Sequence, residues 1–314
     1  MKSLCVVFTL FLFAGCFVPQ RFGDFTHEKF GWKAEDYFVD KDVCSLCDAI
    51  QKNDLISMRE LIDGGVNVDE RGINGMTPLM WAYAENILEP FGDPEPFKML
   101  LAAGANPGVI VKSEFNSKFN IRIGTTVAHM AARSMNSSYF SAILKNGIDP
   151  NLEAASRRPS SKESLFDAVL SGRSERKSDH VEQLLSLKPN QSMLDRSVQE
   201  AINCDEFGIA IKLFKARASA RTYTDWGNMV HLVANREIGS KSNSNRRKDY
   251  LELVQWLVDH GEDFEGAKKD VERWNKHLAS VVDPSIAGTI RKNELRHRAA
   301  TELNPQFSKD LWRK

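Results

Sequence analysis

Apolar residues recur along this chain at helical spacing, in pairs of short segments, and the clearest pair lies between residues 75 and 107. The first segment reads Gly75-Met76-Thr77-Pro78-Leu79-Met80-Trp81-Ala82-Tyr83. Its threonine can cap a helix by accepting a backbone N–H bond, and a proline is well tolerated at the first helical position. The second segment, residues 100–107, ends in Gly-Ala-Asn-Pro, and its glycine can adopt the left-handed conformation that closes a helix. The pattern predicts a capped helix followed by a second, glycine-terminated helix.

The same pair of segments recurs along the chain. The interval between the leading apolar positions of the two helices is fifteen residues in three units, and nineteen, twenty-one and twenty-seven in the other three. We therefore predict six helix pairs between about residues 42 and 265. The leading positions are Leu46 and Leu61, Leu79 and Leu100, Ala128 and Ile143, Leu165 and Leu184, Val198 and Leu213, and Val230 and Leu257.

A helix opened by Thr-Pro-Leu and a helix closed by Leu-Leu-x-x-Gly-Ala resemble the ankyrin repeat. The resemblance implies an all-α fold: an ankyrin-repeat solenoid of about six helix-turn-helix pairs, with β-hairpin fingers along one edge. Residues 266–314, with a helix around Val271–Val281, are expected to cap the stack, which a solenoid needs at its ends for solubility. The family binds proteins through the fingers and the adjacent inner helices, and it has no common catalytic site or cofactor. The resemblance thus implies a protein-binding molecule that is not an enzyme.

The first residues resemble a targeting signal. Lys2 precedes an apolar run, Leu4 to Ala14, which is too short to span a bilayer and fits the apolar region of a secretory signal peptide. Leu12-Phe13-Ala14-Gly15-Cys16 resembles the lipobox of bacterial lipoproteins, although Phe13 stands where that family usually has leucine. The resemblance implies lipidation at Cys16 and, because Phe17 rather than aspartate follows, the periplasmic face of the outer membrane. The alternatives are cleavage elsewhere, giving a soluble periplasmic or secreted protein, and a buried N-terminal helix.

These observations divide the chain into four parts: a signal peptide at 1–15, a lipid anchor and tether or N-terminal cap at 16–41, ankyrin repeats at 42–265, and a helical cap with a basic tail at 266–314. Within the tether, Ala34-Glu35-Asp36-Tyr37-Phe38 is expected to pack over the first repeat helix. The composition is that of a folded protein, with 42% hydrophobic and 27% charged residues, which excludes wholesale disorder. The 42 Lys and Arg balance 42 Asp and Glu, so non-specific nucleic-acid binding is not indicated. Residues 266–314 nevertheless carry +5, and the other 265 carry −5.

The family's binding positions, carried over to this chain, fall before the Thr-Pro-Leu motif and after the Ala-Ala pair. A long finger is predicted between Pro107 and Gly124, because residues 119–123 alternate apolar and polar side chains with the period of a strand. Its phenylalanines would have little core to reach and would mark a partner surface, unless the finger folds back and buries them. The candidate protein-binding residues are Ile73, Asn74, Met76, Glu85, Phe115, Phe119, Ile121, Arg122, Arg133, Ser134 and Trp226. Trp81 is expected in inter-repeat packing, and residues 240–248 are expected to form a solvated basic loop or, alternatively, to touch anionic headgroups.

The remaining motifs give little support to catalysis. Cys44 and Cys47 have the spacing of a redox pair at a helix N-terminus, so a disulfide is possible in an oxidising compartment. In the ankyrin pattern, however, they take the places of the threonine and the histidine, which favours a structural role. Metal ligands are too sparse for a zinc site, and His-Glu-x-x-His, Gly-x-Ser-x-Gly and phosphate-binding glycine motifs are missing. Ser174 and Lys177 match Ser-x-x-Lys without its companion motifs, which we interpret as chance.

We therefore expect a non-enzymatic, lipid-anchored adaptor or scaffold on the periplasmic side of a bacterial envelope. Its partners would be a protein and, through the lipid, the membrane, but neither nucleic acid nor a small-molecule substrate, and it would need no cofactor. One alternative is an immunity protein that blocks a toxic secreted effector such as a lipase. The other is an envelope stress factor supporting a periplasmic redox enzyme, to which the cysteine pair would contribute.

Overall fold

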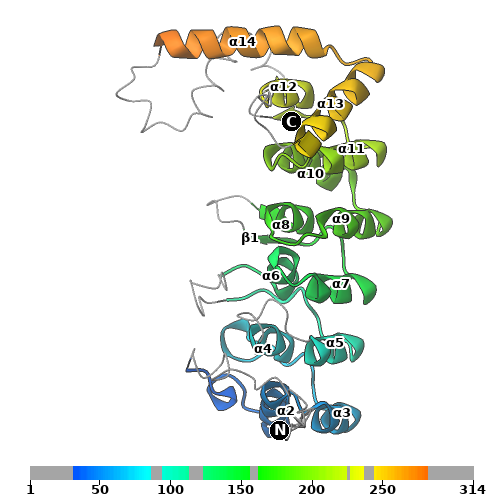
Figure 1. The fold of residues 1–314 in the computed structure, drawn as a ribbon. Helices are drawn as coiled ribbons and strands as arrows, with labels where there is room; N and C mark the ends of the chain where they lie inside the picture. Colours follow the sequence, from blue (N-terminus) through cyan, green and yellow to red (C-terminus); the bar gives the residue numbers. More distant parts are fainter. Residues whose placement is uncertain are drawn as a thin grey trace, which may run out of the picture.

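Six antiparallel helix pairs stack into one column (Figure 1). The computed structural model describes residues 31–85, 94–112, 123–155, 162–224, 227–236 and 244–281. The pairs are α2 (Lys41–Lys52) with α3 (Leu55–Asp63), α4 (Pro78–Glu85) with α5 (Glu95–Ala102), α6 (Val127–Arg133) with α7 (Ser137–Lys145), α8 (Leu165–Ser171) with α9 (Lys177–Ser186), α10 (Gln191–Asn203) with α11 (Phe207–Lys215), and α12 (Met229–Ala234) with α13 (Ser244–Asp259). They are the six pairs predicted from the sequence, and the all-α ankyrin-type solenoid is confirmed.

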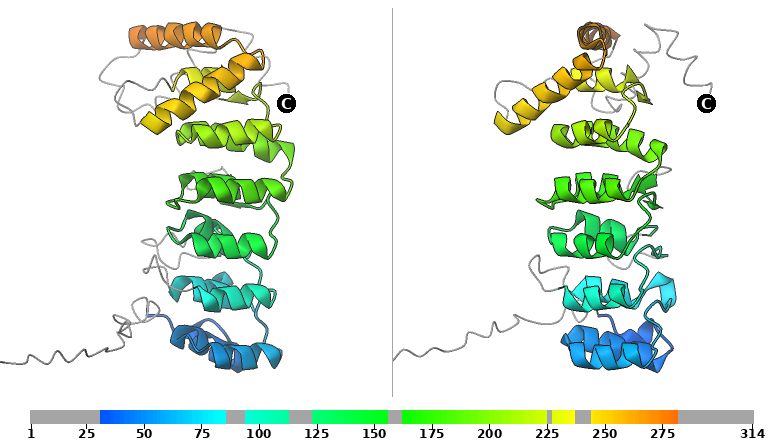
Figure 2. Two further views of the ribbon diagram at one scale, coloured as in Figure 1. Left: turned by 45° about the vertical axis from the view of Figure 1, so that its right-hand side comes forward. Right: turned by 90° about the vertical axis from the view of Figure 1, so that its right-hand side faces the viewer.

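Within the stack, the first helices of the pairs form one row and the second helices form another. The inner helices, α2 to α12 in even numbers, lie above one another, and the outer helices, α3 to α13, form a second column beside them (Figure 1; Figure 2). Short strands precede some of the inner helices: β1 (Glu153–Ala155) pairs antiparallel with β2 (Lys162–Ser164), and β3 (Tyr223–Thr224) with β4 (Gly227–Asn228). Among the described helices, none combines the length and apolar character needed to cross a membrane.

Side-chain caps determine where the inner helices begin. The hydroxyl oxygen of Thr77 accepts a bond from the backbone N–H of Met80 at 3.1 Å, as the Thr-Pro-Leu motif predicts. Thr126 caps α6 through His129 N, and Ser164 forms a reciprocal capping box with Asp167 at the start of α8. Each cap satisfies a backbone donor that a helix N-terminus would otherwise leave unpaired, so these residues fix the register of the helices.

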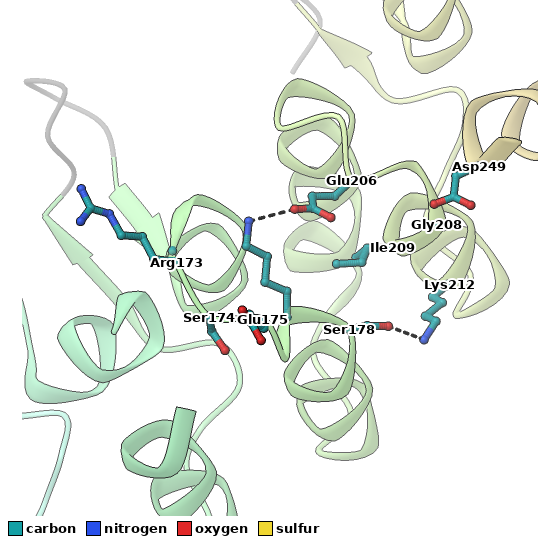
Figure 3. Close-up of a pocket in the computed structure, with 11 residues that line it drawn as sticks. Arg173, Ser174, Glu175, Ser178, Glu206, Gly208, Ile209, Lys212 and Asp249 are labelled. Carbon is teal, nitrogen blue, oxygen red and sulfur yellow. Dashed lines mark hydrogen bonds and ion pairs between the residues drawn. The ribbon is translucent and has the colours of Figure 1, made fainter. Parts of the chain in front are cut away.

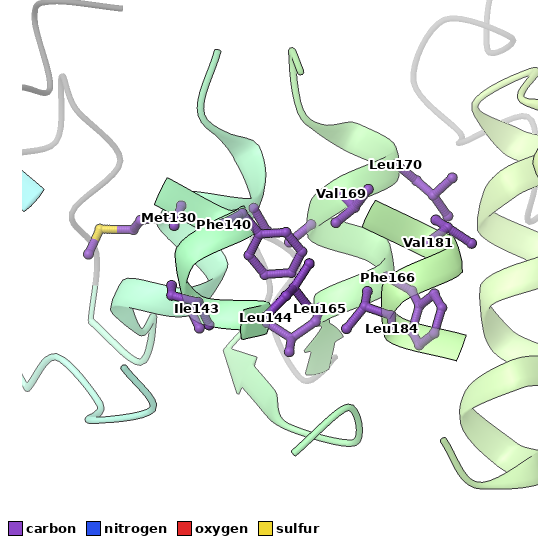
Figure 4. Packing of buried hydrophobic residues seen from close by; sticks show 14 of the residues in the cluster. Met130, Phe140, Ile143, Leu144, Leu165, Phe166, Val169, Leu170, Val181 and Leu184 are labelled. Atoms are coloured by element: carbon purple, nitrogen blue, oxygen red, sulfur yellow. The ribbon is translucent and has the colours of Figure 1, made fainter. Parts of the chain in front are cut away.

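The core is continuous from one pair to the next. Figure 4 shows part of it, in which buried side chains of α6 and α7, among them Phe140 and Ile143, stand beside those of α8 and α9, among them Leu165 and Val169. All four of these side chains are fully buried. Because each pair covers the apolar face of its neighbour, the pairs stabilise one another along the whole column.

Both ends of the described column are covered. At the N-terminal end, η1 (Ala34–Asp36) packs on α2 as expected, and Trp32 and Tyr37 lie with their ring centroids 6.1 Å from that of Trp81. Trp81 is 1% exposed, so its predicted place in the core is confirmed. At the other end, α14 (Phe264–Val281) crosses α12 and α13 and buries Trp274.

Two predicted boundaries near this end are wrong. The cap helix begins at Phe264 rather than near Val271, because Asp263 accepts a bond from Gly266 N at 2.8 Å and starts the helix earlier. Residues 244–248, expected in a basic loop, form the first turn of α13 and are exposed. The run of charges there is the solvated start of a helix.

Candidate protein-binding surface

The segments before α4, α6, α8 and α12 lead into the inner helices, and we call them fingers 1 to 4: residues 68–76, 107–126, 150–164 and 220–228, of which the structure describes all but 113–122, 156–161 and 225–226. Hydrogen bonds join neighbouring segments along the edge. Ile73 N donates to Tyr37 O at 2.9 Å, Lys112 N to Asn74 O at 2.8 Å, and Ala155 N to Gly124 O at 2.9 Å. Residues 31–38 and fingers 1 to 3 therefore form one row whose spacing is fixed by backbone bonds.

Two glycines permit this close approach. Gly75 has φ +81°, and a Cβ atom added there would lie 2.6 Å from the carbonyl oxygen of Ile110 on finger 2. Gly124 has φ +82°, and a Cβ atom there would lie 2.3 Å from the Cβ of Ala155 on finger 3. Any larger residue would both strain the backbone and push adjacent fingers apart.

Large aliphatic side chains are exposed on adjacent fingers of this row. Ile73 on finger 1 is 57% exposed, and on finger 2 Ile110 is 51% and Ile123 61% exposed. Val111, between Ile110 and Lys112, is buried, so side chains alternate between the core and the solvent as in a half-buried strand. Apolar groups presented together on a rigid edge are typical of a surface that a partner covers.

The exposed charges in the described part of the fingers are all positive. They are Arg71 on finger 1, Lys112 on finger 2, Lys162 on finger 3 and Arg221 on finger 4. Lys162 pairs with Glu153 at 3.1 Å while its side chain stays 72% exposed, and Arg221 lies 3.5 Å from Glu262.

The acidic residues of the described fingers are less exposed and are bonded within the chain. Asp69 accepts a bond from Asn106 N at 3.0 Å, and Glu70 accepts one from the Asn67 amide at 2.8 Å. Glu153 pairs with Arg196 at 2.7 Å, and Glu163 pairs with Arg133. The charges of Glu153 and Glu163 are therefore paired with cations of the chain, whereas Asp69 and Glu70 stay half-exposed on finger 1.

Of the residues predicted to bind a partner, two are exposed to solvent, and three others are buried or bonded within the protein. Ile73 and Asn74 are exposed on finger 1. Met76 is fully buried, so the prediction for it is wrong: it directly precedes the cap Thr77, and its side chain packs in the core.

Arg133 is bonded within the protein. Its Nε lies 3.2 Å from Glu163 Oε1, and this ion pair holds finger 3 against the end of α6. Ser134 is half-buried, and its hydroxyl accepts a bond from Asn136 N at 3.1 Å.

Several predicted residues fall outside the described part of the chain. They are Cys16, Phe115, Phe119, Ile121, Arg122, Trp226 and the side chain of Glu85. The structure adds Ile110, Lys112 and Ile123, which the sequence-based selection missed. The alternation of apolar and polar side chains through Val109, Ile110, Val111 and Lys112 was the signal that could have found two of them.

His129 fixes finger 3 from the inside. Its Nε2 N–H donates to the carbonyl oxygen of Glu163 at 3.1 Å, and its Nδ1 accepts from the Thr126 hydroxyl at 2.8 Å. Burial, with a smaller contribution from the nearby Arg133 charge, lowers the pKa of His129 to about 3. The imidazole therefore stays neutral and serves as a structural link between α6 and the finger.

Cys44 and Cys47 are free thiols, which does not support the possible disulfide between them. Cys47 points into the core and is fully buried, whereas the Cys44 thiol donates to Phe38 O at 3.5 Å. Burial raises the pKa of both thiols, that of Cys47 strongly. Both are thus poor nucleophiles at neutral pH, as expected of structural cysteines.

A polar pocket of about 490 Å³ lies between the turn after α8, the start of α11 and α13 (Figure 3). Its lysines are already bonded: Lys177 Nζ lies 2.8 Å from both Leu170 O and Glu206, and Lys212 Nζ lies 2.6 Å from the Ser178 hydroxyl.

Ser174, the serine of the Ser-x-x-Lys match, accepts a bond from Arg176 N. The described contacts of Ser174 and Lys177 are with other groups, so the pair lacks the hydrogen bond expected of a nucleophile and its base. Within the described ranges, no cluster of metal-ligating side chains occurs.

The fold and this edge define an ankyrin-type solenoid with an exposed row of fingers. No protein-family model and no curated protein matches the chain. Among solved structures it is similar to the ankyrin repeat domain of Bcl-3, a member of the IkappaB protein family, with 17% identity and a TM-score of 0.48 over 70% of this chain and 86% of that chain. A similarity of this extent does not indicate a function, so the proposed function is argued from the surface of this chain.

Proposed function

We propose that this protein is a non-enzymatic binding scaffold whose finger row holds a protein partner. The observation that carries the proposal is the exposure of Ile73, Ile110 and Ile123 on fingers whose spacing is fixed by hydrogen bonds. A rigid row loses little conformational entropy on association, so the apolar area that a partner covers contributes directly to affinity. Solenoids of stacked repeats commonly use such extended surfaces for binding.

We also propose that the scaffold acts in a bacterial envelope, anchored through a lipid on Cys16. The apolar run from Leu4 to Ala14 and the lipobox-like sequence before Cys16 support this location. Replacement of Cys16 by alanine should move the protein from the membrane fraction to the soluble fraction of cells. If Cys16→Ala stays with the membranes as the wild type does, the lipid anchor is wrong.

Site-specific photo-crosslinking tests the binding surface. A photo-reactive amino acid at Lys112, on finger 2, should crosslink to one protein species in the native host. The matched position is Arg59, which is exposed on the outer helix α3. A crosslink from Lys112 that Arg59 does not give supports the proposal; equal patterns from the two positions contradict it. An adaptor and an inhibitor of a secreted effector would use the same surface, so the identity of the crosslinked protein separates these two roles.

A further inference from the structure

Two large aliphatic side chains are exposed on the outer helix α13. Leu251 is 55% and Val258 48% exposed, and they lie two helical turns apart, so they project from the same side of the helix. Val254, which is half-buried, lies between them on that side. The three residues form an apolar stripe along α13, and such a stripe is typical of a helix that another element covers.

The stripe faces away from the rest of the column. On another side of α13, the Trp256 ring stacks on Phe214 of α11, with the ring centroids 4.9 Å apart. At about 100° per residue, Trp256 points about 160° away from Val258, so the stripe is turned toward the C-terminal end of the stack. The cap helix α14 packs chiefly on α12 and diverges from α13 beyond the turn that joins them (Figure 2), which leaves the stripe exposed.

The order of the helices in the column indicates what belongs over the stripe. Each inner helix packs on the inner helix before it, and each outer helix from α5 to α13 packs on the outer helix before it. Since α14 packs on α12, it takes the seventh inner position. The seventh outer position lies over α13 and comes next in the chain, and no helix of the described residues occupies it.

Residues 282–314 follow α14 and lie outside the described part of the chain. Their sequence predicts a helix over residues 284–303: Asp283 can cap its N-terminus, Pro284 suits the first helical position, and Pro305 ends it. The large apolar side chains of this segment recur four residues apart, together with one alanine, which is helical spacing. They are Ile286 and Ile290, and then Leu295, Ala299 and Leu303.

The lengths of the two segments match. The helix α14 has 18 residues and spans about 27 Å, and a helix over residues 284–303 spans about 30 Å. A helix that starts shortly after Val281 and runs back antiparallel to α14 therefore returns to the start of α14, beside the end of α13. It is longer than α13, which has 16 residues, so it can cover the whole stripe.

We propose that residues 284–303 form an outer helix that packs on α13 and completes a seventh helix pair with α14. The occupant of the stripe is thus a segment of this chain. A second copy of the protein fits less well, because a stable dimer buries about 800 Å² on each partner, and the stripe offers only two exposed aliphatic side chains. A tethered helix binds to so small an area more readily, since the short link holds it at high effective concentration.

This inference goes beyond the proposed function and does not depend on it. The stripe lies on an outer helix, whereas the fingers lead into inner helices. The docked helix closes the C-terminal end of the outer column as α14 closes the inner one, and a solenoid needs such covered ends for solubility.

Photo-crosslinking within the full-length protein tests the contact. A photo-reactive amino acid at Val258 should crosslink to a peptide from residues 284–303 of the same chain, identified by mass spectrometry. The control position is Glu252, which is exposed on α13 about 120° around the helix from Val258 and should not give that crosslink. Equal yields from the two positions would overturn the inference, as would a crosslink from Val258 to a second copy, to another protein or to no part of 284–303.

Hydrogen exchange measures the same contact without a probe. In the wild type, the backbone amides of residues 286–303 should exchange slowly, and the double variant Leu251→Asp, Val258→Asp should speed their exchange about tenfold or more. The control is Ile56→Asp on α3, where the side chain is 75% exposed, and it should leave exchange in 286–303 within about twofold of the wild type. A thermal melt verifies that both variants fold.

Two results of the exchange experiment would overturn the inference. One is exchange of residues 286–303 in the wild type at the rate of an unstructured peptide, and the other is an unchanged rate in the double variant. The crosslink from Lys112 to a partner tests the finger row separately, so failure of one proposal is distinguishable from failure of the other.

Discussion

Replacement of Gly75 by alanine should destabilise the protein more than the same change at Gly147. Both glycines have positive φ, +81° and +78°, so each alanine would incur the same backbone strain of about 1–2 kcal/mol. Around Gly147 there is no heavy atom within 4 Å of an added Cβ, whereas at Gly75 the Cβ would lie 2.6 Å from the Ile110 carbonyl oxygen. Gly147→Ala therefore measures backbone strain alone, and Gly75→Ala measures strain together with the contact between fingers.

The size of the difference follows from what must move. Relief of the clash requires finger 1 and finger 2 to separate by several tenths of an ångström, which weakens the 2.8 Å bond from Lys112 N to Asn74 O. Loss of a backbone hydrogen bond and the accompanying displacement cost about 1–2 kcal/mol. We expect Gly75→Ala to lose about 2–4 kcal/mol and Gly147→Ala about 1–2 kcal/mol.

Urea unfolding followed by circular dichroism measures both losses, provided that the slopes with denaturant agree between variants. A difference of less than about 0.5 kcal/mol would refute the reasoning, because it would show that contact between the fingers contributes nothing to stability.

Three further predictions concern internal groups. The pKa of His129 is about 3 in the folded protein and 6.5 in the unfolded chain, so between these values the unfolded state binds one more proton, and the unfolding free energy should fall by about 2 kcal/mol from pH 6.5 to pH 5. Urea unfolding of His129→Gln should show a smaller fall over the same pH range, and a fall as large as that of the wild type would contradict the account. Cys47 should react with iodoacetamide only after unfolding, while half-exposed Cys44 reacts slowly in the native protein; peptide mass spectrometry that finds rapid modification of Cys47 would disprove its burial. Glu163→Gln should lower the unfolding free energy by about 2–4 kcal/mol, because it leaves the half-buried Arg133 without its counter-charge, and a loss below about 0.5 kcal/mol would show that the ion pair does not hold finger 3.

The sequence predicts the helix pairs well because their signals are local. Thr77 and Pro78 mark the start of α4, and Gly147 the end of α7, within a few residues of the backbone groups that they satisfy. Local capping depends little on the rest of the fold, so even the units that depart most from the pattern, around Leu165 and Val198, are helix pairs in the structure.

The binding surface is less predictable because distant contacts determine it. Arg133 has the spacing of a partner-binding residue, but Glu163, thirty positions later, folds back to pair with it. Met76 lies one position before a helix cap, where the local sequence does not show that its side chain is fully buried in the core. Similarly, the exposure of Ile110 depends on the hydrogen bonds between fingers, for which a single sequence gives no direct signal.

The most direct test of the central claim compares two isoleucines. Ile110 is 51% exposed on finger 2, and Ile56 is 75% exposed on the outer helix α3, so aspartate at either position is tolerated by the fold. The affinity of the protein that crosslinks to Lys112 should be measured for Ile110→Asp and Ile56→Asp by calorimetry. Covering half of an isoleucine contributes about 1–1.5 kcal/mol, and burying a charge adds to the loss, so Ile110→Asp should weaken binding by about tenfold or more and Ile56→Asp by less than about twofold. Equal affinities for the two variants would contradict binding at the finger row.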